Sequence, residues 1–453
     1  MTTETLLYDS SYAGARRKNV VGKVVGQGLC IGCGTCVPMC PTGALVITED
    51  RREASYRPAV DEEKCDECGI CLIVCPGLGL DFKKLNLSVF GKEPPNTIIG
   101  NHLSCYAGHA TDKDVRRDSA SGGLVTTLIT FALQGGVIDA AMVTRMNMNR
   151  PLEPQPFIAD SVSEVVSAAS SKYCPVPANV ALKEVLNKDR RYVVVGLPCQ
   201  IEGVRKAEML NKRVRDRIQY CFGLVCGHTP SFNATKYLLR KMAIHPRTIA
   251  KLEYRAKGWP GGMNVILRSS AESYIPHFSP CYWGMVFPRF FWQHRCMVCE
   301  DKLCELADIS FMDAWLPEFS SDRLGTSLIV VRSQRGDELV RKAIEAGVVE
   351  LQPIGASKII QAMGMEEVIR KEAARRFILE LFGRSSPVYN SSPYRRATTH
   401  ANYVDLLEAL HFTLSNSLSK ESSRISDFLV DFHVGLWNLG RAVKHLRGSF
   451  RGA

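Results

Sequence analysis

Short apolar runs alternate with helical patterns through the middle of the chain. Three runs are nearly continuous in apolar residues, as expected of strands covered on both faces: GVIDAAMVTR (136–145), RYVVVGLP (191–198) and IQYCFGLVC (218–226). Helical periodicity is found at 124–133 and 201–210, and further strands are predicted at 264–270, 307–315 and 327–333. This alternation predicts a mixed α/β domain over about 106–385.

Helical periodicity returns near the end of the chain. Apolar residues recur there at three- and four-residue steps, which predicts an amphipathic helix: Ile425, Phe428, Phe432, Leu436, Leu439, Val443 and Leu446. We therefore interpret 395–453 as a helical, basic extension. Two roles remain open. The helix packs on its own domain, or it docks onto a partner or the periphery of a membrane, which Arg441, Lys444, Arg447 and Arg451 would favour.

The first hundred residues divide into three parts. Residues 1–20 are polar, lack an apolar stretch of signal-peptide length, and are expected to form a flexible lead. Residues 21–85 are rich in cysteine, and 86–105, with Pro94-Pro95, are interpreted as a linker. The most apolar stretch, 122–143, contains threonines, a glutamine and a Gly-Gly pair, so we predict a helix and a strand there instead of a transmembrane segment.

Composition narrows the class of protein. The 453 residues are 45% hydrophobic and 23% charged, as in globular proteins, and suffice for roughly two to four domains. The net charge of +11 would suit acidic electron carriers or anionic coenzymes. A nucleic-acid partner is not expected, because no basic stretch is interleaved with aromatic residues. The high number of cysteines, 17, indicates metal ligands in a reducing cytoplasm rather than disulfides.

Eight of these cysteines form two copies of the pattern C-x2-C-x2-C-x3-C-P. In two-cluster ferredoxins the first three cysteines of each copy bind one 4Fe-4S cluster and the fourth binds the other. Cluster one would take Cys30, Cys33, Cys36 and Cys75, and cluster two would take Cys65, Cys68, Cys71 and Cys40. Zinc is the alternative, but zinc sites use cysteine pairs. The pattern therefore predicts an electron relay, with Gly32, Gly34 and Gly69 relieving crowding around the clusters.

Four further cysteines could converge on a third site. Cys199 follows a predicted strand and begins a helix, Cys226 ends another strand, and Cys296 and Cys299 form a C-x2-C pair. They could hold one more cluster. On spacing alone, buried packing thiols or a nucleophilic Cys199 remain open alternatives. The other five are interpreted as packing residues, with Cys304 also a conceivable substitute ligand: Cys105, Cys174, Cys221, Cys281 and Cys304.

Small residues precede the helix predicted at 124–133. Ser119-Ala120-Ser121-Gly122-Gly123 would let backbone N–H groups approach an anion such as a pyrophosphate. A plain helix cap is the alternative interpretation.

Six segments, taken in order, resemble the beta-subunit family of the coenzyme F420 hydrogenases and dehydrogenases. They run from about 105 to 335 and cover about half of the chain: SASGGLVTTLITFALQGGVIDAAMV, SSKYCP, VVVGLPCQIEGVRKA, FGLVCGHTPS, YRAKGWPGG and RCMVCEDKLCELADISFMDAW. A fused ferredoxin module is common in that family.

The resemblance implies an FAD-containing iron–sulfur oxidoreductase. Cys199, Cys226, Cys296 and Cys299 would then hold the third cluster, and five residues would contact FAD: Ser121, Gly122, Gly123, Ser171 and Lys172. The implied fold is α+β: a ferredoxin-like two-cluster module, a larger mixed α/β flavin-binding domain and a helical C-terminal tail. The tail lies beyond the family's motifs, and Cys304 is an added thiol within one of them.

Two functions follow from this resemblance. In the first, ferredoxin or a partner subunit delivers electrons through the clusters to FAD, which passes hydride to an unidentified small-molecule acceptor, or the flow runs in reverse. In the second, the chain is a non-catalytic relay subunit of a larger redox complex. Catalytic side chains are not identified by either the residues or the resemblance. Lys172 would be placed to stabilise a negatively charged reduced flavin, or it is simply solvated or ion-paired.

Overall fold

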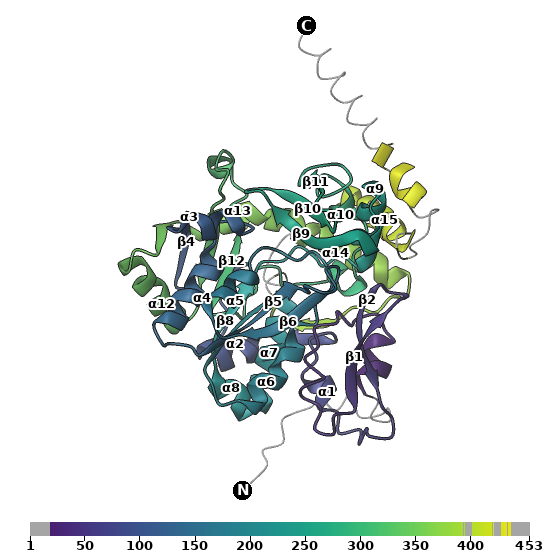
Figure 1. Ribbon diagram of the computed structural model, residues 1–453. Helices are drawn as coiled ribbons and strands as arrows, with labels where there is room; N and C mark the ends of the chain where they lie inside the picture. Colours follow the sequence, from purple (N-terminus) through teal and green to yellow (C-terminus); the bar gives the residue numbers. More distant parts are fainter. Residues whose placement is uncertain are drawn as a thin grey trace.

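A computed structural model of the chain describes residues 19–392, 394, 401–418, 420, 427–432 and 434–435 (Figure 1). Its centre is an eight-stranded sheet in the order β14-β4-β13-β12-β8-β7-β5-β6. The strands span Ser104–Ala110 (β4), Ala140–Met146 (β5), Pro154–Ala159 (β6), Tyr192–Gly196 (β7), Ile218–Leu224 (β8), Ile309–Asp313 (β12), Ser327–Val331 (β13) and Val349–Pro353 (β14). Strands β5, β7, β8 and β12 are parallel, and antiparallel strands extend the sheet on both sides.

Helices cover both faces of this sheet. On one face lie α3 (Lys113–Asp118), α4 (Leu124–Gln134), α5 (Val162–Ser167) and α12 (Gln334–Glu345), and on the other lie α6 (Leu182–Asn187), α7 (Pro198–Leu210), α8 (Lys212–Arg217), α13 (Ala356–Met363) and α14 (Met365–Leu381). Strand β7 illustrates the division: Val193 packs with α4 and α12, whereas Val194 packs with α7. Its run of apolar residues is therefore buried from both sides, as predicted.

A second, antiparallel sheet lies beside the large one. It has the order β11-β10-β9, with strands at Ile249–Ala256 (β9), Gly262–Leu267 (β10) and Glu272–Pro276 (β11). With α9 (Phe232–Lys241), α10 (Val286–Arg289) and the loop between β11 and α10, it encloses an aromatic core that includes Tyr254, Tyr282 and Phe287.

The cysteine-rich module forms a lobe below the sheets (Figure 1). It contains a π-helical turn (Val21–Val25), the hairpin β1–β2 (Leu45–Asp50 and Ser55–Val60), α1 (Ile70–Ile73) and β3 (Gly79–Asp81). Strand β3 pairs with β15 (Val388–Asn390), and α2 (Phe82–Phe90) begins immediately after it and enters the segment 86–105 interpreted as a linker. The module is thus joined to the rest of the chain by a shared sheet as well as by the covalent connection.

The module also makes side-chain contacts across this boundary. Arg57 Nη1 and Ser55 Oγ both donate to Gln293 Oε1, at 3.1 and 3.0 Å. Tyr56 packs edge-on against Phe232, with ring centroids 5.4 Å apart. Gln293 begins α11 (His294–Met297), the helix that carries Cys296. The module therefore packs directly against the segment that carries the predicted third site.

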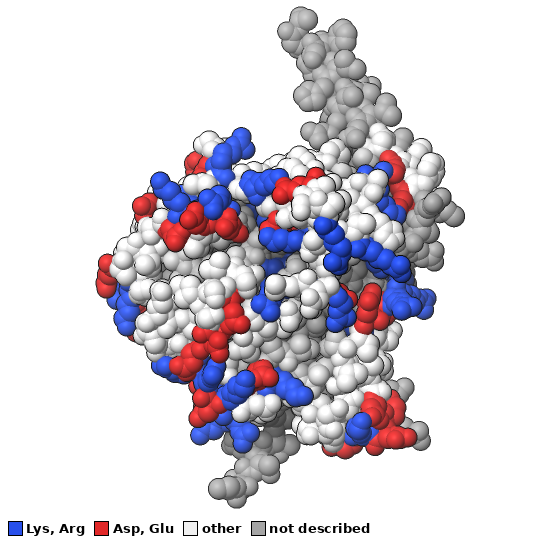
Figure 2. Space-filling view, in the orientation of Figure 1, with Lys and Arg blue, Asp and Glu red and all other residues white. Residues whose placement is uncertain are grey.

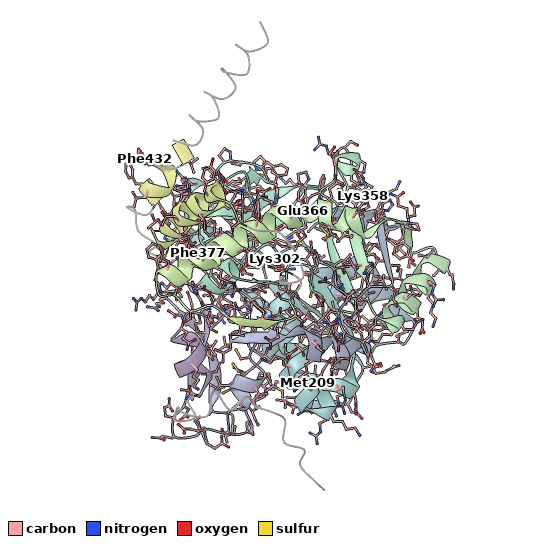
Figure 3. The ribbon with its side chains drawn as sticks, turned by 180° about the vertical axis from the view of Figure 1, so that it is seen from behind. Met209, Lys302, Lys358, Glu366, Phe377 and Phe432 are labelled. Atoms are coloured by element: carbon pink, nitrogen blue, oxygen red, sulfur yellow. The ribbon has the colours of Figure 1, made fainter. Side chains whose placement is uncertain are left out.

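The C-terminal part is described in pieces. Helix α15 (Tyr403–Leu418) packs along α14, and residues 427–432 and 434–435 are helical. In this short segment Val430 is buried in the aromatic core, and Asp431 accepts a hydrogen bond of 2.8 Å from the Tyr237 hydroxyl. Phe428 and Phe432 face outward and stack on each other; Phe432 is labelled in Figure 3. The described segment therefore packs on its own domain through one face.

The rest of the predicted C-terminal helix lies outside the described residues. This applies to Ile425, Leu436, Leu439, Val443 and Leu446, to the four basic residues Arg441, Lys444, Arg447 and Arg451, and to residues 1–18 of the predicted lead. No helix in the described part of the chain is both long and apolar enough to cross a membrane. The stretch 122–143 is a helix followed by the start of a strand, as predicted.

Charged side chains are mixed over the face shown in Figure 2, but acidic side chains gather over the module at the lower right. On this face the acidic side chains are therefore not evenly distributed. Around the second cysteine block, the exposed charged residues are mostly acidic: Glu62, Glu63, Lys64, Asp66 and Glu67.

Candidate redox site

The structure gathers the eight module cysteines into the two crossed groups predicted from the spacing. Cys30, Cys33, Cys36 and Cys75 line one small cavity inside the module. Burial, followed by the charges of Cys33 and Cys30, raises the pKa of Cys75 to about 12. In the second group, burial and then the thiols of Cys68, Cys40 and Cys65 raise the pKa of Cys71. The fourth cysteine of each block therefore lies with the first three of the other block.

Backbone geometry in the module suits a buried cluster. The N–H of Gly32 points to Cys30 Sγ at 3.4 Å, and that of Gly77 points to Cys75 Sγ at 3.3 Å. Gly32 adopts a positive φ of 69°, and a Cβ there would lie 2.4 Å from the carbonyl oxygen of Tyr56. Gly69 also has a positive φ, 77°, but faces open space, so only its backbone conformation favours glycine.

Cys199, Cys226, Cys296 and Cys299 come together at one edge of the parallel strands. Cys199 lies in the first turn of α7, directly after β7, and Cys226 follows β8. Burial raises the pKa of Cys226 to about 12, and the Cys296 and Cys299 thiols add to the rise. Burial also raises the pKa of Cys199, with contributions from the nearby thiols of Cys226 and Cys296.

Lys302 ties together the loops that carry these thiols. Its Nζ donates to the carbonyl oxygens of Gly227 at 2.6 Å and Cys296 at 3.3 Å, while the N–H of Cys226 donates to the Lys302 carbonyl at 2.9 Å. Lys302 is buried and is labelled near the centre of the molecule in Figure 3. The loop 226–227 and the segment 296–302 are therefore held in register by one buried cation.

The residues around the four thiols fit an iron–sulfur cluster. Among the described residues, no three His, Cys, Asp or Glu side chains converge closely enough for a single metal ion. Arg295, only 2% exposed, has its Nε buried without a hydrogen-bond partner, and its charge lies near Cys299 and Cys199. An unpaired buried donor beside four thiols suits the acceptor sulfurs of such a cluster.

The remaining cysteines lie in hydrophobic clusters, as expected of packing residues. Cys105, Cys174, Cys221 and Cys304 are buried in apolar clusters, and Cys281 packs against the aromatic core. Cys304 faces β8, where a Cβ on Gly223 would lie 2.4 Å from its Sγ. Its side chain therefore fills the space between β8 and the loop that precedes β12.

A cavity of about 520 Å³ opens at the carboxyl ends of the parallel strands. Its wall includes the first turn of α4, the ends of β7, β8 and β12, and the loop that follows β8 from Cys226 to Pro230. Its size is that of a cofactor or substrate site, and its position matches the usual ligand site of parallel sheets. Cys226 thus belongs both to the cavity wall and to the third thiol group.

Four of the five residues predicted to contact FAD line this cavity. Ser121 and Gly123 line it at the start of α4, and Ser171 and Lys172 line it from the loop after α5. Gly122 lies behind the wall, where its N–H donates to Ser327 Oγ at 2.9 Å. A Cβ on Gly122 would lie 2.6 Å from the carbonyl oxygen of Gly108, so glycine is required for α4 to start so close to β4.

The charged end of Lys172 is bonded to the backbone of its own loop. Its Nζ donates to the backbone carbonyls of Ala168, Ala169 and Ser170, the latter two at 2.8 Å. Burial lowers the pKa of Lys172 to about 7. All three N–H donors of its ammonium are therefore used to fix the loop, and none is left over for a negatively charged ring.

The polar wall of the cavity was not identified from the sequence. His228 Nε2, Trp283 Nε1 and His277 Nδ1 are all buried without hydrogen-bond partners, and all three residues line the cavity. Burial lowers the pKa of His277 to about 3, which leaves its ring neutral. His228 stands within the segment FGLVCGHTPS, so that segment was a signal for it, but Trp283 and His277 lie outside all six segments.

The rings of these residues form an aromatic part of the cavity wall. His277 is 4% exposed and stacks between two tryptophans. Its ring centroid lies 5.5 Å from that of Trp283 and 5.8 Å from that of Trp315. An aromatic wall with buried hydrogen-bonding edges suits a planar heteroaromatic group such as the isoalloxazine ring of FAD.

Comparisons with known protein families identify the two parts of the chain. Residues 29–77 match the 4Fe-4S dicluster domain. Residues 105–183 and 189–357 match the N-terminal and C-terminal models of the coenzyme F420 hydrogenase/dehydrogenase beta subunit. These two matches cover more than half of the 453 residues, and the chain belongs to this family of iron–sulfur oxidoreductase subunits.

Individual relatives agree with this assignment. The chain is 26% identical to the coenzyme F420 hydrogenase subunit beta of Methanothermobacter thermautotrophicus, over 62% of this chain and 95% of that protein. It is 24% identical to the coenzyme F420-dependent sulfite reductase of Methanocaldococcus jannaschii, over 72% of this chain and 47% of that protein.

One solved structure shares the fold. A chain of the F420-reducing NiFe hydrogenase complex from Methanosarcina barkeri superimposes with a TM-score of 0.51 and 24% sequence identity, covering 66% of this chain and 98% of that one. The predicted mixed α/β architecture with a ferredoxin-like module is therefore confirmed.

Proposed function

We propose that this chain is a flavin-dependent iron–sulfur oxidoreductase in which two module clusters, a third cluster and FAD form one electron path. The observation that carries the proposal is the double position of Cys226, which is a member of the third thiol group and part of the cavity wall. A cluster held by Cys226 would lie beside any group bound in the cavity. Electrons could then cross between them without a further carrier.

The chain's own residues support this order of sites. Cys33 of the first module group lies near enough to Cys199 for its charge to contribute to the raised pKa of Cys199, after burial and the charges of Glu202, Cys226 and Cys296. The module's first group therefore neighbours the third group, and the third group neighbours the cavity. The second group, with Cys68 exposed at the surface, stands at the outer end, where a redox partner could reach it.

The cavity residues would hold FAD in a defined orientation. The first turn of α4 presents N–H groups that the helix itself cannot pair, which suits the pyrophosphate. The aromatic wall at Trp283 and His277 suits the ring. Bound there, FAD would exchange single electrons with a cluster and a hydride with a two-electron acceptor. The relatives' names make coenzyme F420 the first acceptor to test.

Cofactor content after anaerobic purification tests the proposal. We expect about twelve irons and about one FAD in the intact chain, since each cubane holds about four irons. Cys226→Ser should lower the iron content to about eight. It should also slow electron transfer between the bound flavin and the module clusters, because the third cluster would be lost. Cys281→Ser is the matched control, because Cys281 is partly buried but lies outside all three thiol groups. About eight irons in the unmodified chain after cluster reconstitution would contradict the third site.

Absence of flavin after reconstitution would favour the second function, a non-catalytic relay subunit. In that case the protein would still carry electrons between cluster-bearing partners but would not reduce coenzyme F420 or any other hydride acceptor. The partners themselves, whether ferredoxin or another subunit, can be sought by measuring which reduced carrier bleaches the clusters.

A further inference from the structure

A buried hydrogen-bonded chain joins the Cys33 sulfur to helix α7. Cys33 Sγ lies 3.3 Å from Thr35 Oγ1, and Asn179 Nδ2 lies 2.8 Å from that same hydroxyl oxygen. Asn179 Nδ2 also donates to the carbonyl oxygen of Gln200 at 2.8 Å, and the Asn179 backbone N–H donates to the Cys33 carbonyl at 2.9 Å. Thr35 and Asn179 are both 0% exposed.

The acceptor atoms in this hydrogen-bonded series determine where its hydrogen atoms lie. The Gln200 carbonyl can only accept, so the Asn179 atom facing it must be the amide nitrogen and not its oxygen. The second hydrogen of that nitrogen is directed at Thr35 Oγ1. Because the hydroxyl oxygen is already an acceptor there, its own proton is free to point to Cys33 Sγ. Asn179 therefore makes Thr35 a donor toward the sulfur.

Close packing keeps this arrangement rigid. A Cβ on Gly203 of α7 would lie 2.3 Å from Thr35 Oγ1, and one on Gly34 would lie 2.8 Å from Val180 Cγ1. The loop and the helix thus approach as closely as two glycines allow. Water has no access to the hydroxyl, because Thr35 has no exposed surface.

We propose that Asn179 is a positioning residue for the first module cluster: acting from the α/β domain, it orients the Thr35 hydroxyl toward the Cys33 sulfur and raises the reduction potential of that cluster. The inference rests on the proposed function only in assigning Cys33 as a ligand. A hydrogen bond to a cluster sulfur offsets the negative charge gained on reduction, and therefore favours the reduced state.

The second block repeats the Cys-x-Thr spacing in a more exposed form. Cys40 Sγ and Thr42 Oγ1 lie 3.6 Å apart, Cys40 is only partly buried and Thr42 is exposed, so water competes for the hydroxyl. The Thr42 hydroxyl should therefore affect its own cluster less than the buried Thr35 hydroxyl affects the first.

Redox titration of the full chain, monitored by electron paramagnetic resonance, tests the inference. In Thr35→Val the donor is lost while the shape is kept, and we expect the one-electron equilibrium constant for reducing one module cluster to fall about tenfold, which is about 59 mV toward more negative potential. Thr35→Ser keeps the hydroxyl and should restore the midpoint. Asn179→Asp should also lower it, since the carboxylate would accept the Thr35 proton that otherwise points to Cys33.

Thr42→Val is the matched control, and it should leave that midpoint unchanged. The inference is overturned if Thr35→Val retains full iron content and shifts no midpoint, or if Thr42→Val shifts the same midpoint equally. The role of Asn179 is also overturned if Asn179→Asp retains full iron content and shifts no midpoint, while the Thr35 pair decides whether the hydroxyl acts on the cluster at all. The iron count keeps this result separate from the proposed function: about eight irons in the unmodified chain would remove the third cluster but would leave the effect of Thr35 on the module intact.

Discussion

Asp308 is a buried carboxylate that contacts helices on both faces of the large sheet. It is 0% exposed and directly precedes β12. Its Oδ2 accepts from Arg205 Nη2 on α7 at 2.9 Å and from the N–H of Cys221 on β8 at 2.7 Å, and its Oδ1 accepts from Arg335 Nε on α12 at 2.7 Å. One carboxylate thus links α7 and α12, which lie on opposite faces of the sheet.

Asp308→Asn keeps the size of the side chain and removes its charge. Breaking one partner from a buried ion pair costs about 3–5 kcal/mol in general. The lower end applies here, because Arg205 retains Glu208, at 3.0 and 3.1 Å, and the Leu306 carbonyl, at 2.9 Å. We therefore expect a loss of about 3 kcal/mol in the free energy of unfolding.

The matched control is Asp189→Asn. Asp189 pairs with Arg217 at 3.2 Å, but its side chain is 92% exposed, so its removal should change stability by less than about 1 kcal/mol. Both variants would be compared with the unmodified chain by anaerobic urea denaturation, followed by circular dichroism, at equal iron and flavin content. A loss below about 1 kcal/mol for Asp308→Asn would refute the reasoning.

The pH dependence gives a second check on Asp308. Burial alone would raise the pKa of this carboxyl, but Arg205 and Arg335 lower it to about 2. The unfolded value is about 3.9, so the stabilisation is complete above about pH 4 and is lost only as the pH falls toward 2. The difference between the unmodified chain and Asp308→Asn should therefore be the same at pH 6 and pH 8. A difference that changes between these two values would implicate another titrating group.

Two further predictions concern the cavity and the module. Gly122→Ala should weaken flavin binding and destabilise the fold by a few kcal/mol, since its Cβ would lie 2.6 Å from the Gly108 carbonyl oxygen. The control Gly355→Ala should be nearly neutral, because its Cβ would meet only Ser357 Oγ at 3.4 Å. Flavin fluorescence measures the binding, and thermal melting measures the stability of both variants. Reduction of the clusters by the anion dithionite should speed up with ionic strength, because salt screens the acidic surroundings of Cys65 and Cys68, and stopped-flow bleaching at low and high salt would contradict this if the rate fell.

Much of the fold was predictable because the large sheet depends on local patterns. The strands at 191–198 and 218–226 and the helix at 201–210 were predicted nearly to their ends, since buried parallel strands are continuously apolar. Strand β4 and its neighbour β14 were missed, because Ser104–Ala110 contains serine, glycine and histidine and is half polar. Its place in the sheet is set by pairing with β13 and not by its own composition.

The site was predictable where spacing carries the chemistry and not where tertiary contacts do. The crossed cysteine groups follow from a repeated motif, and the third group from two strand ends and a C-x2-C pair. Nothing in the local sequence marks Asn179, which lies in a short 3-10 turn and becomes significant only because the module's Cys33–Thr35 loop docks on it. His277 was missed for the same reason, since its neighbours Trp283 and Trp315 are distant or unpatterned in sequence.

The cavity wall bears on the choice between an enzyme and a pure relay. A relay needs no ligand pocket, and leaving a buried polar group without a partner costs about 1–3 kcal/mol. Three such nitrogens belong to His228, Trp283 and His277, whose side chains line one cavity of about 520 Å³ with Cys226 in its wall. A chain selected only to hold clusters would gain stability by replacing these side chains with apolar ones of similar size. Their presence is accounted for if a ligand with a polar, planar edge occupies the cavity during function. His277→Phe should then raise the melting temperature of the flavin-free protein and weaken its affinity for FAD, whereas a relay without a ligand would show only the first effect.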